Sequence, residues 1–327
     1  MPDQITDPPP ADVASQLAAL SAALDQVIPP KQPGENLLIG TWNVRAFDRL
    51  TPKWRSVSGD SPIRDLSNLL CIAEVVRRFD VIAVQEVRRT AQALLAMLQV
   101  LGEGWAFLVT DVTRGRRGNA ERLAFVFDRQ RVRPSGLACE LVVAAEDAGI
   151  PEATLRGQFA RTPYAVSFAS ERGVFTLVTL HVIYGQGPAD RIAELQQIAG
   201  WLAGWATGGD PWGSNLIALG DFNIDRQGDP LYQAFTSTGL RPPAGLNHVP
   251  RTVFDDPDPA APPDHRHFYD QIAWFTDAPG VPALTLQYQN AGMFNFADGL
   301  IPAATTMQLS WRISDHFPLW VEFRLPP

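Results

Sequence analysis

Two apolar runs in the chain end in the same way, and this repetition restricts the folds that the sequence can adopt. Residues 216–219 lead to Asp221 and Asn223, and residues 81–84 lead to Glu86. Apolar runs of this length are typical of buried strands. Because residues two apart on a strand point the same way, Asp221 and Asn223 are expected to face one pocket. A simple turn is the alternative interpretation, since Gly, Asp and Asn all favour turns.

Length and composition favour a large α+β domain with a substantial core. The 327 residues are 46% hydrophobic, and no apolar run reaches the roughly 20 residues of a membrane span. The net charge of −8 disfavours nonspecific coating of nucleic acid but permits basic groups local to a cleft. Cys71 and Cys139 lack the spacing of a disulfide or metal pair, so we interpret both as reduced core residues.

The N-terminal residues differ from the rest of the chain. Residues 1–36 open rich in Pro and Asp, and we expect a flexible tail there, followed by one domain at 37–327. Apolar residues recur at helical spacing from Val13 to Val27, which predicts an amphipathic helix. Packing on the domain is the first interpretation, and a partner or dimer contact through residues 13–28 is the alternative. The absence of a signal-like N-terminus indicates a cytoplasmic protein, with signal-independent export left open.

Polar residues stand at or near the ends of most predicted strands. Besides the two runs above, strands are predicted at residues 37–44, 121–127, 164–169, 174–180, 269–275, near 283–288 and at 317–323, with helices at 64–79, 91–101 and 189–205. The polar set is Asn43, Glu86, Glu121, Arg161, His181, Asp221, Asn223, Asp270, Asp315 and His316. Carboxylates can hold Mg²⁺ or Mn²⁺, and histidines can transfer protons. Arginines and amides can bind a phosphate.

Six motifs, in this order, resemble those of the endonuclease/exonuclease/phosphatase superfamily. They are TWNVRAF, VIAVQEV, TLHVIYG, ALGDFNID, YDQIAWF and ISDHFPLW, and they lie within residues 38–325. The resemblance implies a four-layer α-β-β-α sandwich of the α+β class. It also implies a hydrolase of phosphoester bonds that depends on Mg²⁺ or Mn²⁺.

The resemblance implies a metal and phosphate site at matching positions. Glu86 would be the principal metal ligand, assisted by Asn43 and approached by Asp315. Asp221 and Asn223 would lie against the scissile phosphate, with Asp221 aiding the metal or the nucleophile.

The same resemblance implies two catalytic histidines. His316, paired with Asp270, would activate water or stabilise the phosphorane. His181 would be the second, oriented by Glu121. Which histidine acts as acid and which as base stays open.

Closer details resemble deoxyribonuclease I-like enzymes. The QEVR and FARTPY segments imply that Arg88 and Arg161 contact the substrate backbone or phosphate. A Gly- and Arg-rich loop containing Arg116 and Arg117 would contact phosphate, although a solvated hairpin tip is the alternative. Position 119 is Asn where an aromatic residue that inserts into the DNA groove would be expected, so the sequence departs from these enzymes at this point.

The sequence therefore predicts a metal-dependent phosphodiesterase, in the first interpretation a DNA endonuclease. The alternative within the superfamily is a phosphatase or phosphodiesterase of a small or lipid phosphoester, of the inositol phosphate or sphingomyelin type. The alternative outside enzymes is a non-catalytic binding domain on the same fold.

Overall fold

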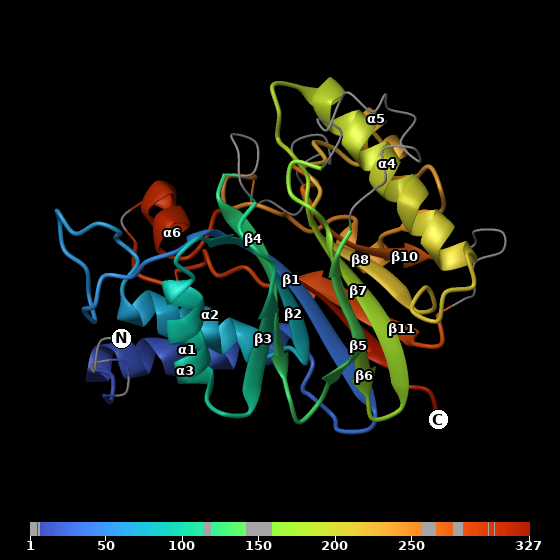
Figure 1. The fold of residues 1–327 in the computed structure, drawn as a ribbon. Helices are drawn as coiled ribbons and strands as arrows, with labels where there is room; N and C mark the ends of the chain where they lie inside the picture. Colours follow the sequence, from blue (N-terminus) through green and yellow to red (C-terminus); the bar gives the residue numbers. More distant parts are fainter. Residues whose placement is uncertain are drawn as a thin grey trace.

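Two six-stranded sheets pack face to face in the computed structural model, and helices cover both outer faces (Figure 1). The structure describes residues 5, 7–113, 119–141, 159–256, 266–276, 284–299, 301–303 and 305–327. The four layers run helix, sheet, sheet, helix. The predicted α+β sandwich is confirmed.

Each sheet is built around one central parallel pair of strands. The first contains β1 (Asn36–Phe47), β2 (Val81–Arg88), β3 (Trp105–Val109), β4 (Glu121–Asp128), β11 (Gln287–Met293) and β12 (Leu319–Arg324), in the order β11-β12-β1-β2-β4-β3. The second contains β5 (Arg133–Glu140), β6 (Tyr164–Ser170), β7 (Gly173–His181), β8 (Leu216–Asp221), β9 (Leu240–Arg241) and β10 (Asp270–Phe275), in the order β5-β6-β7-β8-β10-β9. The parallel pairs are β1–β2 and β7–β8. Each pair therefore ends at a single edge of its sheet.

Helices on the two outer faces close the sandwich. The first sheet is covered by α1 (Ala11–Val27), α2 (Leu66–Val76) and α3 (Gln92–Leu101), and the second by α4 (Pro188–Thr207) and α5 (Pro230–Thr236) (Figure 1). Two shorter elements are η2 (Ala244–Leu246) and α6 (Thr306–Arg312). A capping box starts α2, because Asp65 Oδ1 accepts from Asn68 N at 3.0 Å and Asn68 Oδ1 accepts from Asp65 N at 3.2 Å.

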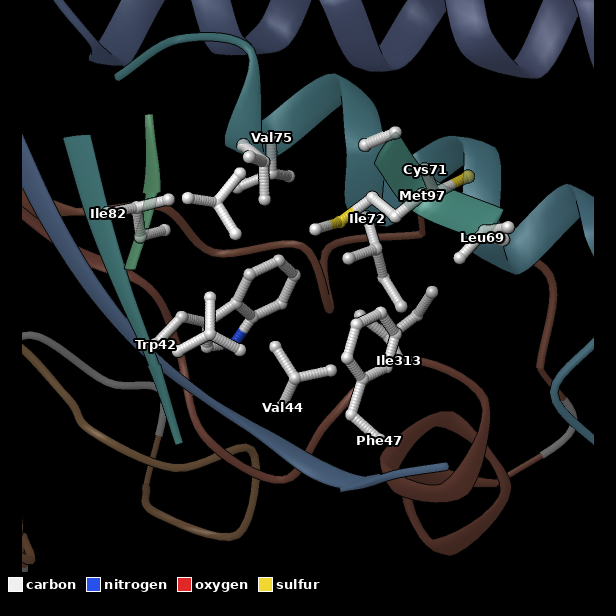
Figure 2. Close-up of a cluster of buried hydrophobic side chains, with 14 of the residues drawn as sticks. Trp42, Val44, Phe47, Leu69, Cys71, Ile72, Val75, Ile82, Met97 and Ile313 are labelled. Atoms are coloured by element: carbon white, nitrogen blue, oxygen red, sulfur yellow. The ribbon is translucent and has the colours of Figure 1, made fainter. Parts of the chain in front are cut away.

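The central strands bury both of their faces, and this explains their continuous apolar sequences. In β1, Leu37 and Ile39 pack in the core between the sheets, whereas Leu38 and Trp42 pack under the helices. Figure 2 shows the helix side of this strand, where Trp42 lies near Ile72 of α2. Strands covered on both faces do not alternate between apolar and polar residues.

The helix predicted near the N-terminus packs on the first sheet's helices. Leu20 and Leu24 of α1 are fully buried in the same cluster as α2. Arg78, just beyond α2, donates to Ser21 Oγ at 2.7 Å and pairs with Asp25. The division of the chain at residue 36 stays a prediction.

Edge strands and short helices are where the sequence prediction departs from the structure. The strands β3, β5 and β9 and the helices α5 and α6 were not predicted, and β11 begins four residues later than the strand predicted near 283–288. In β5 and β11, exposed and polar positions interrupt the apolar pattern, as edge strands allow.

Three smaller predictions have mixed outcomes. Both cysteines are free thiols, but Cys139 is only half-buried and Cys71 alone is a core residue. The irregular segment predicted at 141–157 lies almost wholly outside the described residues. None of the described helices is both long and apolar enough to cross a bilayer.

We expect Gly220→Ala to destabilise the fold by about 3 kcal/mol or more. Gly220 has φ +138°, and a Cβ there would lie 2.1 Å from the carbonyl oxygen of Leu180 on the neighbouring β7. The matched control is Gly228→Ala, where φ is +82° and the space is open, so that the loss should be only about 1–2 kcal/mol. Urea unfolding measures both. Equal losses would show that the close approach of the strands does not matter.

Candidate active site

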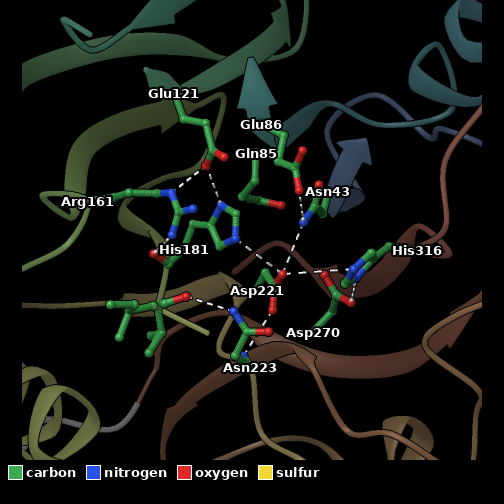
Figure 3. A network of polar contacts seen from close by, with 12 residues as sticks. Asn43, Gln85, Glu86, Glu121, Arg161, His181, Asp221, Asn223, Asp270 and His316 are labelled. Carbon is green, nitrogen blue, oxygen red and sulfur yellow. Dashed lines mark hydrogen bonds and ion pairs between the residues drawn. The ribbon is translucent and has the colours of Figure 1, made fainter. Parts of the chain in front are cut away.

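Most of the polar side chains predicted to be functional meet at one edge of the sandwich (Figure 3). In the second sheet, His181 of β7 and Asp270 of β10 are both paired in register with Asp221 of β8. In the first sheet, Asn43 and Glu86 lie near the ends of the parallel strands β1 and β2. All of these except Asp270 line a pocket of about 400 Å³, here called the site pocket. Strand register therefore assembles the site from residues far apart in sequence.

Asp221 lies between the two predicted catalytic histidines. Its Oδ2 is 3.5 Å from His181 Nε2 and 4.0 Å from His316 Nε2. The same oxygen accepts a hydrogen bond from Asn43 Nδ2 at 3.0 Å, and Oδ1 accepts one from Asn223 N at 2.9 Å. The carboxylate is thus fixed in place, with an imidazole on either side of one oxygen.

His181 and Glu121 form the first histidine–carboxylate pair. His181 Nδ1 is 3.0 Å from Glu121 Oε2, and the Arg161 guanidinium pairs with the same oxygen. Burial acts to raise the pKa of Glu121, but His181 and Arg161 outweigh it and lower the pKa to about 2. An ionised Glu121 holds Nδ1 of the ring, which directs Nε2 towards Asp221.

His316 and Asp270 form the second pair. His316 Nδ1 lies 2.6 Å from Asp270 Oδ2, and Arg251 Nε donates to the backbone oxygen of Asp270 at 2.8 Å. Burial raises the pKa of Asp270 to about 6, against the opposing effect of His316. Burial acts to lower the pKa of His316, but Asp270 and Asp221 raise it well above its ordinary value. The His316–Asp270 pair therefore keeps the proton between His316 Nδ1 and Asp270 Oδ2 at neutral pH.

Asn43 and Glu86 lie on the first-sheet side of the pocket. Asn43 Nδ2 donates to Glu86 Oε1 at 3.3 Å, and Ala46 N donates to Glu86 Oε2 at 2.9 Å. Glu86 has φ +59° and Ala46 has φ +45°. Left-handed backbone is costly for residues other than glycine and tends to occur at functional sites.

The donors around Asn43 and Glu86 fit a hard divalent cation. Asn43 Oδ1 is buried and has no hydrogen-bond partner among the described residues. An unused amide oxygen beside a carboxylate is the ligand chemistry that Mg²⁺ and Mn²⁺ prefer.

A second group of ligand atoms comes from Asp221, Asp270 and His316, which offer atoms within 4.8 Å of one another. Two of these residues are already bonded to each other through His316 Nδ1 and Asp270 Oδ2. The oxygen-only group is therefore the better fit for Mg²⁺. Asp221 belongs to the second group and contacts the first through its hydrogen bond from Asn43.

Asp315 is engaged by an arginine. Arg45 Nη1 lies 3.1 Å from Asp315 Oδ2, and the guanidinium stacks over the Trp311 ring at 3.9 Å. Asp315 lines the pocket, and its approach to a metal stays a prediction.

The residues predicted to bind phosphate mostly contact protein groups. Arg88 Nη2 lies 3.2 Å from Glu86 Oε2, and Arg88 Nη1 lies 3.3 Å from Glu121 Oε1. Asn223 Nδ2 donates to Val182 O at 2.7 Å. Arg161 pairs with Glu121. Arg88 and Arg161, the predicted phosphate-binding arginines that the structure describes, therefore both neutralise carboxylates in the pocket wall. Arg116 and Arg117 lie outside the described residues.

Several residues of the site were not found from the sequence. Gln85 Nε2 donates to Thr179 Oγ1 at 2.9 Å, joining the two sheets beneath the pocket. His267 lines the pocket and is bound to Asp255. Gln85 is next to Glu86 in its motif, and His267 lies three residues before Asp270. Nearness to a motif is the signal that could have identified them.

The fold and the site define a class of phosphoester hydrolase, in which two packed sheets hold two histidine–carboxylate pairs around an aspartate. The family model of the endonuclease/exonuclease/phosphatase family matches residues 40–316. The chain belongs to this family.

Two curated relatives are deoxyribonucleases. The deoxyribonuclease of Thioalkalivibrio sp. (strain K90mix) is 26% identical over 205 residues, which cover 61% of this chain and 49% of that protein. Deoxyribonuclease-1 of Bos taurus is 27% identical over 203 residues, which cover 59% of this chain and 63% of that protein. The chain thus spans about half to just under two-thirds of the lengths of these relatives.

A solved structure with the same fold is the mannosyl-6-phosphatase of Bacteroides thetaiotaomicron VPI-5482. Its TM-score is 0.55 at 17% sequence identity, and the match covers 88% of this chain and 99% of that one. At this identity the likeness establishes the fold.

Glu194 of α4 is half-buried, and its carboxyl group contacts the segment that follows His181. Its Oε2 accepts from Ile183 N at 3.4 Å, and its Oε1 is buried without a partner among the described residues. Burial raises the pKa of Glu194 to about 7, and Ile183 N–H, Arg161 and His181 only partly oppose this.

Glu194 should make the protein less stable as pH rises. Because its folded pKa lies above its ordinary value of 4.5, the contribution to stability is full below pH 4.5 and is lost as pH rises through about 7. We expect Glu194→Gln, which mimics the protonated form, to stabilise the protein by roughly 1–3 kcal/mol at pH 8 and to have little effect at pH 4.5. Urea unfolding at both pH values measures this, with Glu103→Gln on the surface as control. A gain that is the same at both pH values would contradict the expectation.

Proposed function

We propose that the chain is a divalent-metal-dependent phosphodiesterase that cleaves DNA. The convergence of two histidine–carboxylate pairs on Asp221, beside Asn43 and Glu86, carries the proposal. The two curated relatives named as deoxyribonucleases support nucleic acid as the substrate.

Asp221 and the two imidazoles have the geometry for the two proton transfers of hydrolysis. A water molecule attacks phosphorus in line and gives its proton to Asp221, and the bond from phosphorus to the leaving oxygen breaks. The leaving oxygen takes a proton from Nε2 of one of the two imidazoles. Glu121 and Asp270 hold the two rings so that Nε2 faces the substrate.

Glu86 and Asn43 would hold the cation, through a carboxylate oxygen and the unpartnered Asn43 Oδ1. When bound, a divalent cation neutralises negative charge on a non-bridging phosphate oxygen. Arg88 pairs with both Glu86 and Glu121 and so offsets the repulsion between these two carboxylates.

A small phosphoester is the second candidate substrate, and two observations favour it. Among the described residues, the two arginines that line the site pocket are paired with its carboxylates, so neither of these two stands ready to bind a DNA backbone. Tyr184, whose side chain is 59% exposed, lies at the mouth of the pocket and narrows the approach. A duplex needs more room there than a small phosphoester does.

We expect Glu86→Gln and Asp221→Asn each to lower turnover about 10²–10⁴-fold with the fold intact. A panel of plasmid DNA, phosphoinositide and sphingomyelin, each with Mg²⁺, Mn²⁺ or EDTA, identifies the substrate. Glu103→Gln, an exposed carboxylate far from the site, serves as the matched control.

Full metal-dependent activity in Glu86→Gln would rule out the metal assignment. If the protein hydrolyses a small phosphoester and leaves plasmid DNA uncleaved, the small phosphoester replaces DNA as the proposed substrate. Absence of both turnover and Mg²⁺ binding, the latter measured by calorimetry, would indicate a non-catalytic binding domain.

A further inference from the structure

A third histidine–carboxylate pair stands in the wall of the site pocket. His267 Nδ1 lies 2.7 Å from Asp255 Oδ1. The Asp255 side chain is 1% exposed, whereas that of His267 is 33% exposed and lines the pocket. The carboxylate is thus hidden behind the ring, and the imidazole is the group that a substrate meets.

The backbone that carries this pair is fastened to the segment of His316. Val253 N donates to Asp315 O at 2.9 Å, and Phe317 N donates to Arg251 O at 2.8 Å. Asp255 itself accepts from His267 N at 3.1 Å and from Arg251 N at 3.3 Å. The pair is therefore held in a fixed position relative to the pocket.

The ring of His267 is the outermost of three adjoining rings. It stacks on Tyr269, with ring centroids 4.4 Å apart and planes at 26°. Tyr269 in turn lies 5.7 Å from the His316 ring. With Nδ1 on Asp255 and one face on Tyr269, the remaining polar atom is Nε2, which has no partner among the described residues.

An anion suits this nitrogen better than a cation does. The described residues contain one group of three or more potential metal ligands, and His267 is not part of it. When both ring nitrogens carry a proton, Nδ1–H donates to Asp255 and Nε2–H is left to donate to an anion. Arg88 and Arg161, the arginines of the pocket within the described part of the chain, already pair with Glu86 and Glu121.

We propose that His267, held by Asp255, binds the phosphate group next to the scissile phosphate in a polynucleotide chain. This inference rests on the proposed cleavage of nucleic acid. His267 is separated from His316 by the Tyr269 ring, where the neighbouring unit of a chain substrate would lie. It is a positioning residue, and the chemistry at Asp221 does not need it.

The test neutralises one phosphate at a time. Three oligothymidylates are compared. In them the phosphodiester to be cleaved is flanked by a neutral methylphosphonate linkage on the 5′ side, on the 3′ side or on neither side. Kd is measured by fluorescence anisotropy, and KM and kcat are measured by cleavage with Mg²⁺. The variants are His267→Gln, Asp255→Asn and the control His248→Gln, a histidine outside the site pocket.

For wild type and His248→Gln, Kd and KM should rise about tenfold when one particular flanking phosphate is neutralised, because a hydrogen bond to a charged group is lost. His267→Gln should bind all three oligonucleotides alike, with an unchanged kcat. Asp255→Asn should lose part of the discrimination, and His267→Gln tests the proposal even where Asp255→Asn fails to fold.

The inference is wrong if His267→Gln discriminates among the oligonucleotides as wild type does, or if it lowers kcat equally on all three. Wild type that binds the oligonucleotides with this discrimination but does not cleave them would overturn the proposed function and leave the phosphate contact standing. Cleavage by wild type without discrimination would overturn the contact alone.

Discussion

Negative charge is concentrated at one edge of the two sheets, and the surrounding structure keeps it there. Carboxylates this close repel one another unless cations or hydrogen-bond donors compensate them. The compensating pairs are Arg88 with Glu86 and Glu121, Arg161 and His181 with Glu121, His316 with Asp270, and Arg45 with Asp315. Among the described residues Asp221 has no arginine partner and relies on two amides and two imidazoles. It is therefore the carboxylate left available for chemistry.

Two fully buried arginines fasten the segments that carry this charge. Arg64 donates to the backbone oxygens of residues 45, 46, 312 and 313, and so joins the end of β1 to the segment before His316. Arg251 donates to the backbone oxygens of residues 246, 249 and 270. Burial lowers the pKa of both guanidinium groups to about 10, which leaves them charged at neutral pH. Each one satisfies several carbonyl groups that would otherwise be buried without donors.

The sequence predicts this structure best where the physical signal is local. Central strands are continuous apolar runs, so β1, β2, β7 and β8 were found together with the polar residues at their ends. Edge strands such as β5 mix exposed and buried positions and lack such a run. The pairing of His181 with Glu121 and of His316 with Asp270 depends on long-range register, and only the family resemblance predicted it. The salt bridges of Arg88 and Arg161 and the His267–Asp255 contact depend on tertiary packing, which no spacing in the sequence encodes.

The similarity of the two histidine–carboxylate pairs has a consequence for the orientation in which a phosphodiester binds between them. A phosphodiester has two ester oxygens on opposite sides of phosphorus, and both pairs present the same ring nitrogen to one oxygen of Asp221. These two nitrogens alone treat the ester oxygens alike. Any difference in how the two ester oxygens are treated must then come from what differs around these nitrogens: Arg161 and Arg88 beside His181, and Tyr269 and His267 beside His316.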